Sequence, residues 1–363
     1  MKMVERKTFS SESDNAQLLK KSRDSENVVV KVAMLDGTTL ELGISKKSKG
    51  QELLNTVCEL ANILEKEYFG LIYTKKRSSR NWLDMEEKIE RHIKFEPWLI
   101  HFEVKFYPPD PSQLQEDITR YQLCLQIRND ILNNKLPCSL VTLALLGSYL
   151  VQSELGDFNS ETMQDDYLSS FKFGFDQNEE LESKIMELHK LHKGETPAQA
   201  ELNFLENAKK LPMYGIDFHS AKDSDGFEIR IGVHSSGLVI FKNQLRMNKF
   251  VWPKIVKISF KEHNFYIKLR IDQFDEFQST VCFKLESYRD AEKLWKSAVE
   301  HHSFFRLMSP RVKEKRILPR LGSKFRYSGR TLYQTRQEKI ERPAPKFERS
   351  LTCLADCKVK NLS

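Results

Sequence analysis

The chain has 363 residues and a net charge of +7, from 58 Lys and Arg and 51 Asp and Glu. Hydrophobic residues make up 40% and charged residues 30%, which is typical of a folded protein with a charged surface. The length exceeds one usual core and predicts two or three domains. No apolar run approaches the roughly 18 residues that cross a bilayer, and the polar start is not a signal peptide, so we expect a protein of the cytosol or of a membrane face.

The positive charge is concentrated near the end of the chain. Residues 310–363 hold 15 Lys and Arg and 5 Asp and Glu, so the first 309 residues carry 7 − 10 = −3. Such a basic segment could bind nucleic acid, an anionic membrane leaflet or an acidic protein. Nucleic acid is the least supported of these three partners, because the rest of the chain has no zinc-finger, helix-turn-helix or aromatic RNA-binding signature.

The cysteines and histidines do not predict a metal site. Four of the six cysteines lie in apolar patterns where a small hydrophobic residue is expected, so we interpret them as reduced thiols. Cys353 and Cys357 have no second Cys or His pair to complete a zinc site, and the two pairs of nearby histidines lack the spacing of a metalloprotease helix. We expect no metal and no cofactor.

The first quarter of the chain predicts a mixture of strands and helix. Residues 1–26 are polar and aperiodic, and we expect them to be disordered. After them, two alternating segments joined by Asp36-Gly37 predict a β-hairpin, since this dipeptide favours the positive φ of a tight turn. A helix follows, with one apolar stripe made of Leu53, Val57, Leu60 and Leu64.

A boundary lies within residues 101–121. An alternating strand stops at Pro108 and Pro109, because neither proline can donate to a β-ladder, and an amphipathic helix begins a few residues later. Residues 110–211 then predict helices, of which the apolar segment 139–157 is expected to be the buried one.

The last helix of this part has a clear start signal. Thr196 as N-cap, Pro197 at the first helical position and Gln199 three residues past the cap predict a capping box. After residue 212 the pattern predicts seven strands with a hairpin turn at Asp225-Gly226, and then one helix whose apolar face packs in the core.

Three stretches resemble one protein family. They are KFYPPDP at residues 105–111, TPAQAELNFLENAKKL at 196–211 and the segment 321–350, which reads LGSKFRYSGRTLYQTRQEKIERPAPKFERS. All three are similar to FERM-domain proteins of the protein 4.1 (band 4.1) family, and the last resembles the FERM-adjacent region of that family.

The resemblance implies an α+β fold of three lobes. A ubiquitin-like lobe is expected at 27–109, an acyl-CoA-binding-like helical lobe at 110–211, and a pleckstrin-homology or phosphotyrosine-binding-like sandwich with a C-terminal helix at 212–308. A basic FERM-adjacent region at 309–350 and a tail at 351–363 would complete a short form of the family, without the spectrin–actin-binding segment.

Nothing in the sequence predicts an enzyme. No Cys has the neighbouring His and the Arg six residues on that a tyrosine phosphatase needs, and no glycine-rich kinase loop occurs. The resemblance implies a scaffold that links membrane proteins and anionic phosphoinositides at the inner face of the plasma membrane to the cortical cytoskeleton. Two alternatives stay open: a short regulatory form that competes with longer relatives, and an acyl- or lipid-binding protein, which the helical lobe alone suggests.

The resemblance also implies partners and a lipid site. The partners would be cytoplasmic tails of the anion-exchanger or glycophorin type, phosphatidylinositol bisphosphate, calmodulin, membrane-associated guanylate-kinase scaffolds and cytoskeletal proteins. The resemblance places the protein at the cell cortex, with a further pool in the cytoplasm. The lipid site would use Lys209, Lys210 and a basic pair of the first lobe. That pair aligns with Glu90-Arg91, so only Arg91 keeps the charge and we expect weakened inositide binding.

Two further candidate sites concern peptides. The family contacts an anion-exchanger tail through an acidic stretch, which is matched here by Leu64, Glu65, Lys66, Glu67 and Tyr68, with Lys66 interrupting the acidic run. A groove between a predicted edge strand at 279–285 and the last helix, 287–305, would let a peptide add a strand.

The FERM-adjacent region holds two candidate phosphorylation sites. Ser328 and Thr331 follow basic residues, and basophilic kinases recognise this sequence context. A phosphate adds roughly −1.5 to −2, so we expect modification to weaken membrane attraction. The alternative is a passive basic arm. Because only residues 27–308 carry sustained apolar periodicity, we expect them to form the folded body, with flexible ends.

Overall fold

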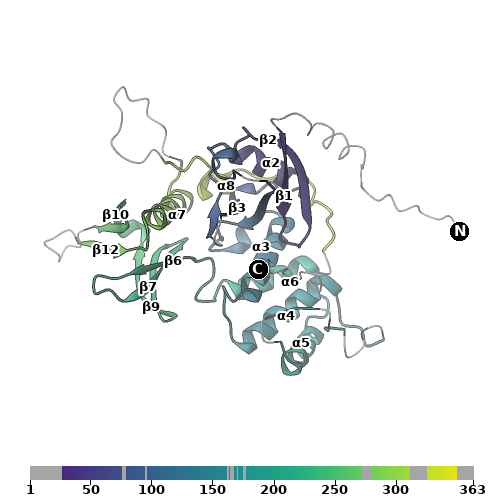
Figure 1. Ribbon diagram of the computed structural model, residues 1–363. Coiled ribbons are helices and arrows are strands. Elements are labelled where there is room, and N and C mark those ends of the chain that lie inside the picture. The colour runs from purple at the N-terminus through teal and green to yellow at the C-terminus, as the bar shows by residue number, and fades with distance from the viewer. Residues whose placement is uncertain are drawn as a thin grey trace. The chain divides into compact units, whose positions relative to one another are not determined.

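The computed structural model describes residues 27–75, 79–94, 96–161, 163, 167–169, 171–174, 177–270, 279–310 and 325–349. These residues fall into two compact units, unit 1 at 27–104 and unit 2 at 105–349, which are drawn together in Figure 1. Among the described residues, no helix is both long and apolar enough to cross a membrane.

Unit 1 is a five-stranded sheet with one α-helix. Its elements are β1 (Asn27–Ala33), β2 (Thr39–Ser45), α2 (Gly50–Leu60), η2 (Lys66–Tyr68), β3 (Phe69–Lys75), β4 (Ser79–Trp82), η3 (Ile89–Arg91) and β5 (Trp98–Val104). The strand order is β2-β1-β5-β3-β4, with β1 and β5 parallel. The hairpin predicted at Asp36-Gly37 is confirmed: Gly37 has a φ of 84°, and the Asp36 carboxylate accepts from the Thr38 N–H at 2.9 Å.

The apolar stripe predicted for the helix of unit 1 is only half right. Leu53 and Val57 are buried, whereas Leu60 is 59% and Leu64 48% exposed. The helix ends at Leu60, so the period of 3.6 residues no longer applies to Leu64.

Unit 2 begins with helices. They are η4 (Pro111–Gln113), α3 (Asp117–Leu132), α4 (Leu140–Leu155), α5 (Glu179–Leu191) and α6 (Pro197–Ala208). Side-chain oxygens of Ser139, Asn178 and Thr196 cap the last three. The capping box predicted at Thr196 is half formed, because the side chain of Gln199 donates to Asn203 instead of reaching back to the cap.

The strands of unit 2 form one seven-stranded sheet that folds into a sandwich. They are β6 (Asp217–Lys222), β7 (Glu228–His234), β8 (Gly237–Lys242), β9 (Leu245–Val251), β10 (Ile255–Lys261), β11 (Asn264–Leu269) and β12 (Thr280–Lys284), with η5 (Trp252–Lys254) before β10. The order is β10-β11-β12-β6-β7-β8-β9. Helix α7 (Tyr288–Arg306) lies across these strands in Figure 1 and buries Ala291, Leu294, Trp295 and Ala298 against them.

The segment 325–349 is also part of unit 2. It contains the short helix α8 (Leu332–Gln337), whose N-cap Thr331 forms a complete capping box with Gln334. Leu332 is buried, and the ring of Phe347 lies 5.3 Å from that of Tyr121. The expectation that the folded body ends near residue 308 is therefore wrong for this segment.

Three residues at the start of unit 2 contact helices from two parts of the unit, α7 beside the sheet and α3 of the helical part. Lys105 pairs with Glu300 of α7 at 2.7 Å, and both side chains are largely buried. The ring of Phe106 stacks on Phe304, also in α7, at 4.3 Å. In the other direction, the Tyr107 hydroxyl donates to Asp130 of α3.

We predict that Phe106→Ala lowers the free energy of unfolding by about 3–5 kcal/mol, because Phe106 is 2% exposed and its loss leaves a cavity beside Phe304. Urea denaturation of the purified chain measures this. Phe227→Ala is the control, since that ring is 54% exposed and should change stability far less. Equal effects would show that the stack on Phe304 contributes little.

Candidate binding surfaces

The two lysines at the end of α6 have different surroundings. Lys209 donates to Glu206 at 2.7 Å and to Asp110 at 3.2 Å, and the hydrogen bond to Glu206 is the main reason that the pKa of Lys209 is raised. Lys210 is exposed and donates only to the neutral side-chain oxygen of Asn207, at 3.2 Å. Two carboxylates therefore neutralise Lys209, while the charge of Lys210 faces solvent.

Arg91 belongs to unit 1. It is 66% exposed and lies 3.6 Å from Glu87, while the adjacent Glu90 lies 3.8 Å from Lys88. Positive and negative side chains thus alternate around η3. This local neutralisation makes Arg91 a weak anion site by itself.

The acidic stretch after α2 does not form a continuous exposed face. Glu65 and Tyr68 are each 3% exposed, and Lys66 donates to Asn55 at 2.9 Å. Leu64 is the only one of the five residues from 64 to 68 that is largely exposed. The stretch could therefore present an apolar contact more readily than an acidic one.

The strand predicted as the sheet edge beside the last helix is an inner strand. β12 pairs with β11 along its length and with β6 at Lys284 and Lys222, so the prediction of an edge at 279–285 is wrong. The edge strand beside α7 is β10. There the ring of Phe260 lies 5.4 Å from both Tyr288 and Trp295 of α7, and Val256 is 54% exposed.

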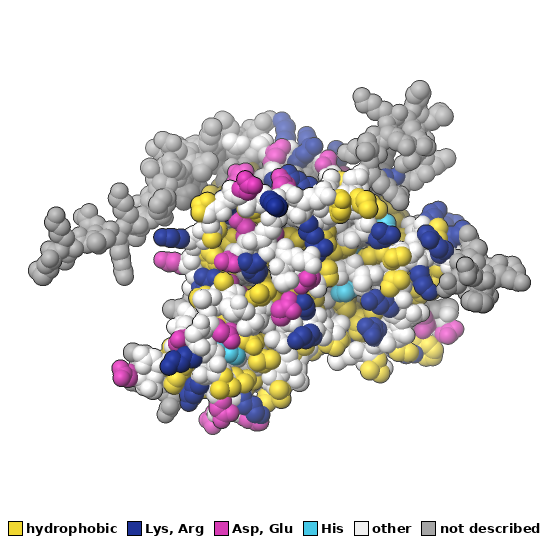
Figure 2. Space-filling view, turned by 180° about the vertical axis from the view of Figure 1, so that it is seen from behind, with side chains coloured by type: hydrophobic (Ala, Val, Ile, Leu, Met, Phe, Trp, Pro, Cys, Tyr) yellow, Lys and Arg dark blue, Asp and Glu magenta, His cyan; other side chains and the backbone are white. Residues whose placement is uncertain are grey.

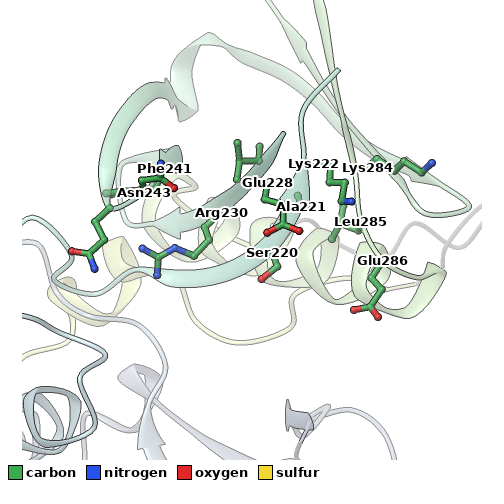
Figure 3. A pocket seen from close by; sticks show the side chains of 12 residues that line it. Ser220, Ala221, Lys222, Glu228, Arg230, Phe241, Asn243, Lys284, Leu285 and Glu286 are labelled. Atoms are coloured by element: carbon green, nitrogen blue, oxygen red, sulfur yellow. The ribbon is translucent and has the colours of Figure 1, made fainter. Parts of the chain in front are cut away.

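A cleft of about 820 Å³ opens where β6 and β12 separate (Figure 3). Three cations line it, Lys222, Arg230 and Lys284, together with two carboxylates, Glu228 and Glu286. In Figure 3, Arg230 and Asn243 lie on one side and Lys284 and Glu286 on the other. The sequence pattern did not indicate this cleft, because it depends on how two strands diverge.

The two candidate phosphorylation sites differ in access. Ser328 is exposed, whereas Thr331 is fully buried. The Thr331 hydroxyl donates to the carbonyl of Met308 at 3.1 Å and accepts from the Gln334 N–H at 3.3 Å. A kinase can reach Ser328 directly, but Thr331 only after this part of the chain opens.

Arginines of the last segment pair with buried carboxylates of the helices. Arg342 lies 2.6 Å from Glu116, and Arg349 lies 2.5 Å from Glu201, which is 1% exposed. Burial raises the pKa of Glu201, and Arg349 opposes that shift. Two of the positive charges that suggested a free basic arm therefore form ion pairs within unit 2.

Ser148, His192 and Glu195 form an arrangement that resembles a hydrolase triad. The Ser148 Oγ and His192 Nε2 are 2.8 Å apart, and His192 Nδ1 lies 3.5 Å from Glu195. Ser148 is fully buried within α4, however, and its hydroxyl donates to the Leu145 carbonyl, so the serine is not available to a substrate. The described residues contain no cluster of His, Cys, Asp and Glu that could hold a metal ion.

Four family models match consecutive parts of the chain. They describe the FERM N-terminal domain at residues 32–94, the FERM central domain at 109–219, the FERM C-terminal PH-like domain at 223–313 and the FERM adjacent region at 317–352. These are not enzyme families, in agreement with the prediction that the chain is not an enzyme.

Similar proteins and structures extend the match. The chain is 55% identical to Band 4.1-like protein 3 of Homo sapiens over 92% of its own length and 31% of the relative, and 56% identical to Protein 4.1 of Bos taurus over 88% and 52%. It therefore spans about a third to a half of these relatives. The crystal structure of the FERM and C-terminal domain complex of Drosophila Merlin aligns with a TM-score of 0.69 at 27% identity, over 76% of this chain and 95% of that one.

We predict that Arg349→Ala costs about 3 kcal/mol in unfolding free energy, because it leaves the buried Glu201 carboxylate without its cationic partner. The same change should cost less in a Glu201→Gln background, and a double-mutant cycle by urea denaturation measures the difference. Arg330→Ala is the control, since Arg330 and its partner Glu338 are both more than half exposed and such pairs contribute about 0–1 kcal/mol. Equal costs in the two backgrounds would contradict the coupling.

Proposed function

Since the chain is a FERM-domain protein of the protein 4.1 family, we propose that it links transmembrane proteins and anionic lipids at the inner face of the plasma membrane to the cortical cytoskeleton. The observation that carries this proposal is the run of three FERM lobes followed by a FERM-adjacent region, at more than 50% identity to protein 4.1 relatives.

The lipid contact of this proposal is centred on Lys210. Lys210 is an exposed cation at the end of α6, while Lys209 contributes less because Glu206 and Asp110 already neutralise it. Arg91, in unit 1, is a separate candidate cation for the same class of lipid. Phosphatidylinositol bisphosphate is the expected ligand, bound weakly and in a salt-sensitive way.

The protein contact of this proposal is the free edge of β10 beside α7. β10 is an edge strand to which an extended peptide could add, its Phe260 ring packs against Tyr288 of α7, and its Val256 is 54% exposed. Tails of the anion-exchanger or glycophorin type are the proposed occupants. Leu64 offers a second, smaller apolar contact, and calmodulin and membrane-associated guanylate-kinase scaffolds are further proposed partners.

Of the two alternatives, the packing of the helices disfavours an acyl-binding protein. The space between α4 and α5 is filled by buried side chains, and a Cβ added at Gly147 would meet Ile185 at 2.8 Å and Phe173 at 3.0 Å. The helices therefore touch too closely there to leave room for an acyl chain. A regulatory form that competes with longer relatives is compatible with the same binding surfaces.

We predict that Lys210→Glu weakens binding to vesicles that contain phosphatidylinositol bisphosphate by about tenfold, because each basic residue near an anionic surface is worth about 1 kcal/mol and the change reverses one. Vesicle sedimentation measures the apparent Kd. Lys172→Glu, an exposed position elsewhere on the helical lobe, makes the same change in net charge. Similar losses in both variants would remove Lys210 from the lipid site.

We predict that a basophilic kinase modifies Ser328 at least tenfold faster than Thr331, because only Ser328 is exposed in the folded chain. Site-resolved mass spectrometry over a time course measures both rates. Arg349→Ala should speed modification of Thr331 if it loosens the last segment. Equal rates at the two sites of the unaltered chain would contradict the burial of Thr331.

A further inference from the structure

The outer strand β9 carries an unusual exposed surface. It forms one edge of the sheet of unit 2, and its first five residues are all exposed. Among them, Leu245 is 69% and Met247 62% exposed, although both are large apolar side chains. Large apolar residues that are exposed on an edge strand favour aggregation unless they have a partner.

The same region has a large excess of positive charge. From residue 237 to 270 there is one acidic residue, Glu262, and eight basic ones: Lys242, Arg246, Lys249, Lys254, Lys257, Lys261, Lys268 and Arg270. Arg246 and Lys249 form no ion pair with any described carboxylate. Over the side of Figure 2 where strands β6 to β12 lie, dark blue Lys and Arg side chains predominate over magenta ones.

A tight turn holds this surface at the tip of a hairpin. Asn243 and Gln244 connect β8 to β9 with φ values of 48° and 68°, as in the two-residue turns with positive φ that suit a twisted hairpin. Before the turn, Phe241 is 1% exposed and anchors β8 in the core, and the Lys242 ammonium lies over the Phe227 ring at 3.9 Å. Buried packing and a cation–π contact therefore hold the strand that leads into the turn.

The neighbouring cleft limits which ligand fits. Asn243 and Gln244 line one rim of it, so the hairpin tip and the cleft are continuous (Figure 3). Lys222 and Lys284 lie directly opposite each other in the only pairing between β6 and β12, but Glu228 and Glu286 lie in the same cleft. The net charge of the cleft lining is thus 3 − 2 = +1, too little for a highly charged headgroup. The exposed residues 245–249 of β9, in contrast, include two cations and no carboxylate.

We propose that the β8–β9 hairpin is a second membrane contact, in which Leu245 and Met247 enter the interfacial layer of an anionic bilayer while Arg246 and Lys249 bind its headgroups. The inference rests on the proposed membrane role and adds a site on the third lobe to the one at Lys210. Apolar side chains between cations match a surface that is anionic outside and apolar beneath. With contacts on two lobes of unit 2, the bilayer would hold that unit in one orientation.

A bilayer fits this hairpin better than an acidic protein does. A protein partner would need a groove or a flat complementary face, whereas Leu245 and Met247 are exposed beside the turn of a hairpin. Insertion of exposed side chains requires only a deformable apolar layer. An acidic protein would bind through Arg246 and Lys249 and gain little from the two apolar residues.

Vesicle sedimentation with phosphatidylcholine and phosphatidylglycerol tests the proposal on the whole chain. We expect Leu245→Ser with Met247→Ser to weaken binding about tenfold, and Arg246→Glu with Lys249→Glu at least thirtyfold. The matched controls are Val141→Ser with Leu191→Ser, both more than 70% exposed, and Lys172→Glu with Lys193→Glu. Arg246→Lys with Lys249→Arg keeps the charge and should bind like the unaltered chain, and thermal melts identify any variant that fails to fold.

A second measurement reports insertion directly. A Met247→Trp variant should lose fluorescence on vesicles whose acyl chains carry bromine, because the indole then lies within the bilayer. Absence of quenching, or binding that depends on the cations but not on Leu245 and Met247, would overturn the proposal in favour of an acidic protein or simple electrostatic attraction. Full binding by both hairpin variants would overturn this inference alone, whereas failure of the unaltered chain to bind any anionic vesicle would overturn the lipid part of the proposed function as well.

Discussion

The stack of Phe106 on Phe304 organises unit 2, because the segment that carries it leads from the first lobe into the second. Because β5 ends at Val104, ahead of Pro108 and Pro109, the three residues between the strand and the prolines no longer alternate between two faces of the sheet. Lys105 and Phe106 contact α7, while Tyr107 contacts the helices through Asp130 and its ring lies 5.5 Å from that of Tyr214. The last segment joins the same cluster, since the Tyr327 ring lies 5.9 Å from Phe106. One short stretch thus ties together helices, sandwich and FERM-adjacent region.

Local signals predicted the elements of this fold well, and the FERM fold with its three lobes is confirmed. The paired prolines, the Asp36-Gly37 turn and the Thr196 cap act on their own neighbours, so a single sequence is enough to interpret them. The position of β12 in the middle of the sheet was not predictable in this way, because it depends on pairing with β11 and β6, and β6 lies about sixty residues earlier in the chain. Alternation identifies a strand but does not identify the strands beside it.

For the candidate sites, the sequence identifies which residues are charged but not which of those charges are neutralised by a partner. Sequence identified Lys209 and Lys210 as one basic pair, yet tertiary contacts neutralise the first and leave the second exposed. It also assigned the basicity of the protein to the last segment, where Arg342 and Arg349 are in fact paired with buried glutamates. The basic surface of β9 is not apparent from the sequence, because the acidic residues elsewhere in the first 309 residues outweigh its charge and give this part a net charge of −3. Only a structure separates paired charges from unpaired ones.

The contact between Trp295 and Phe325 makes the position of the last segment visible to spectroscopy. Trp295 is 8% exposed, its indole N–H donates to the Ile258 carbonyl at 3.3 Å, and the Phe325 ring lies 6.0 Å away. Detachment of the segment would uncover one face of this indole and shift its emission toward that of a hydrated tryptophan. The protein therefore contains its own optical probe of whether the FERM-adjacent region is docked, close to the β10 edge that is proposed to bind a receptor tail.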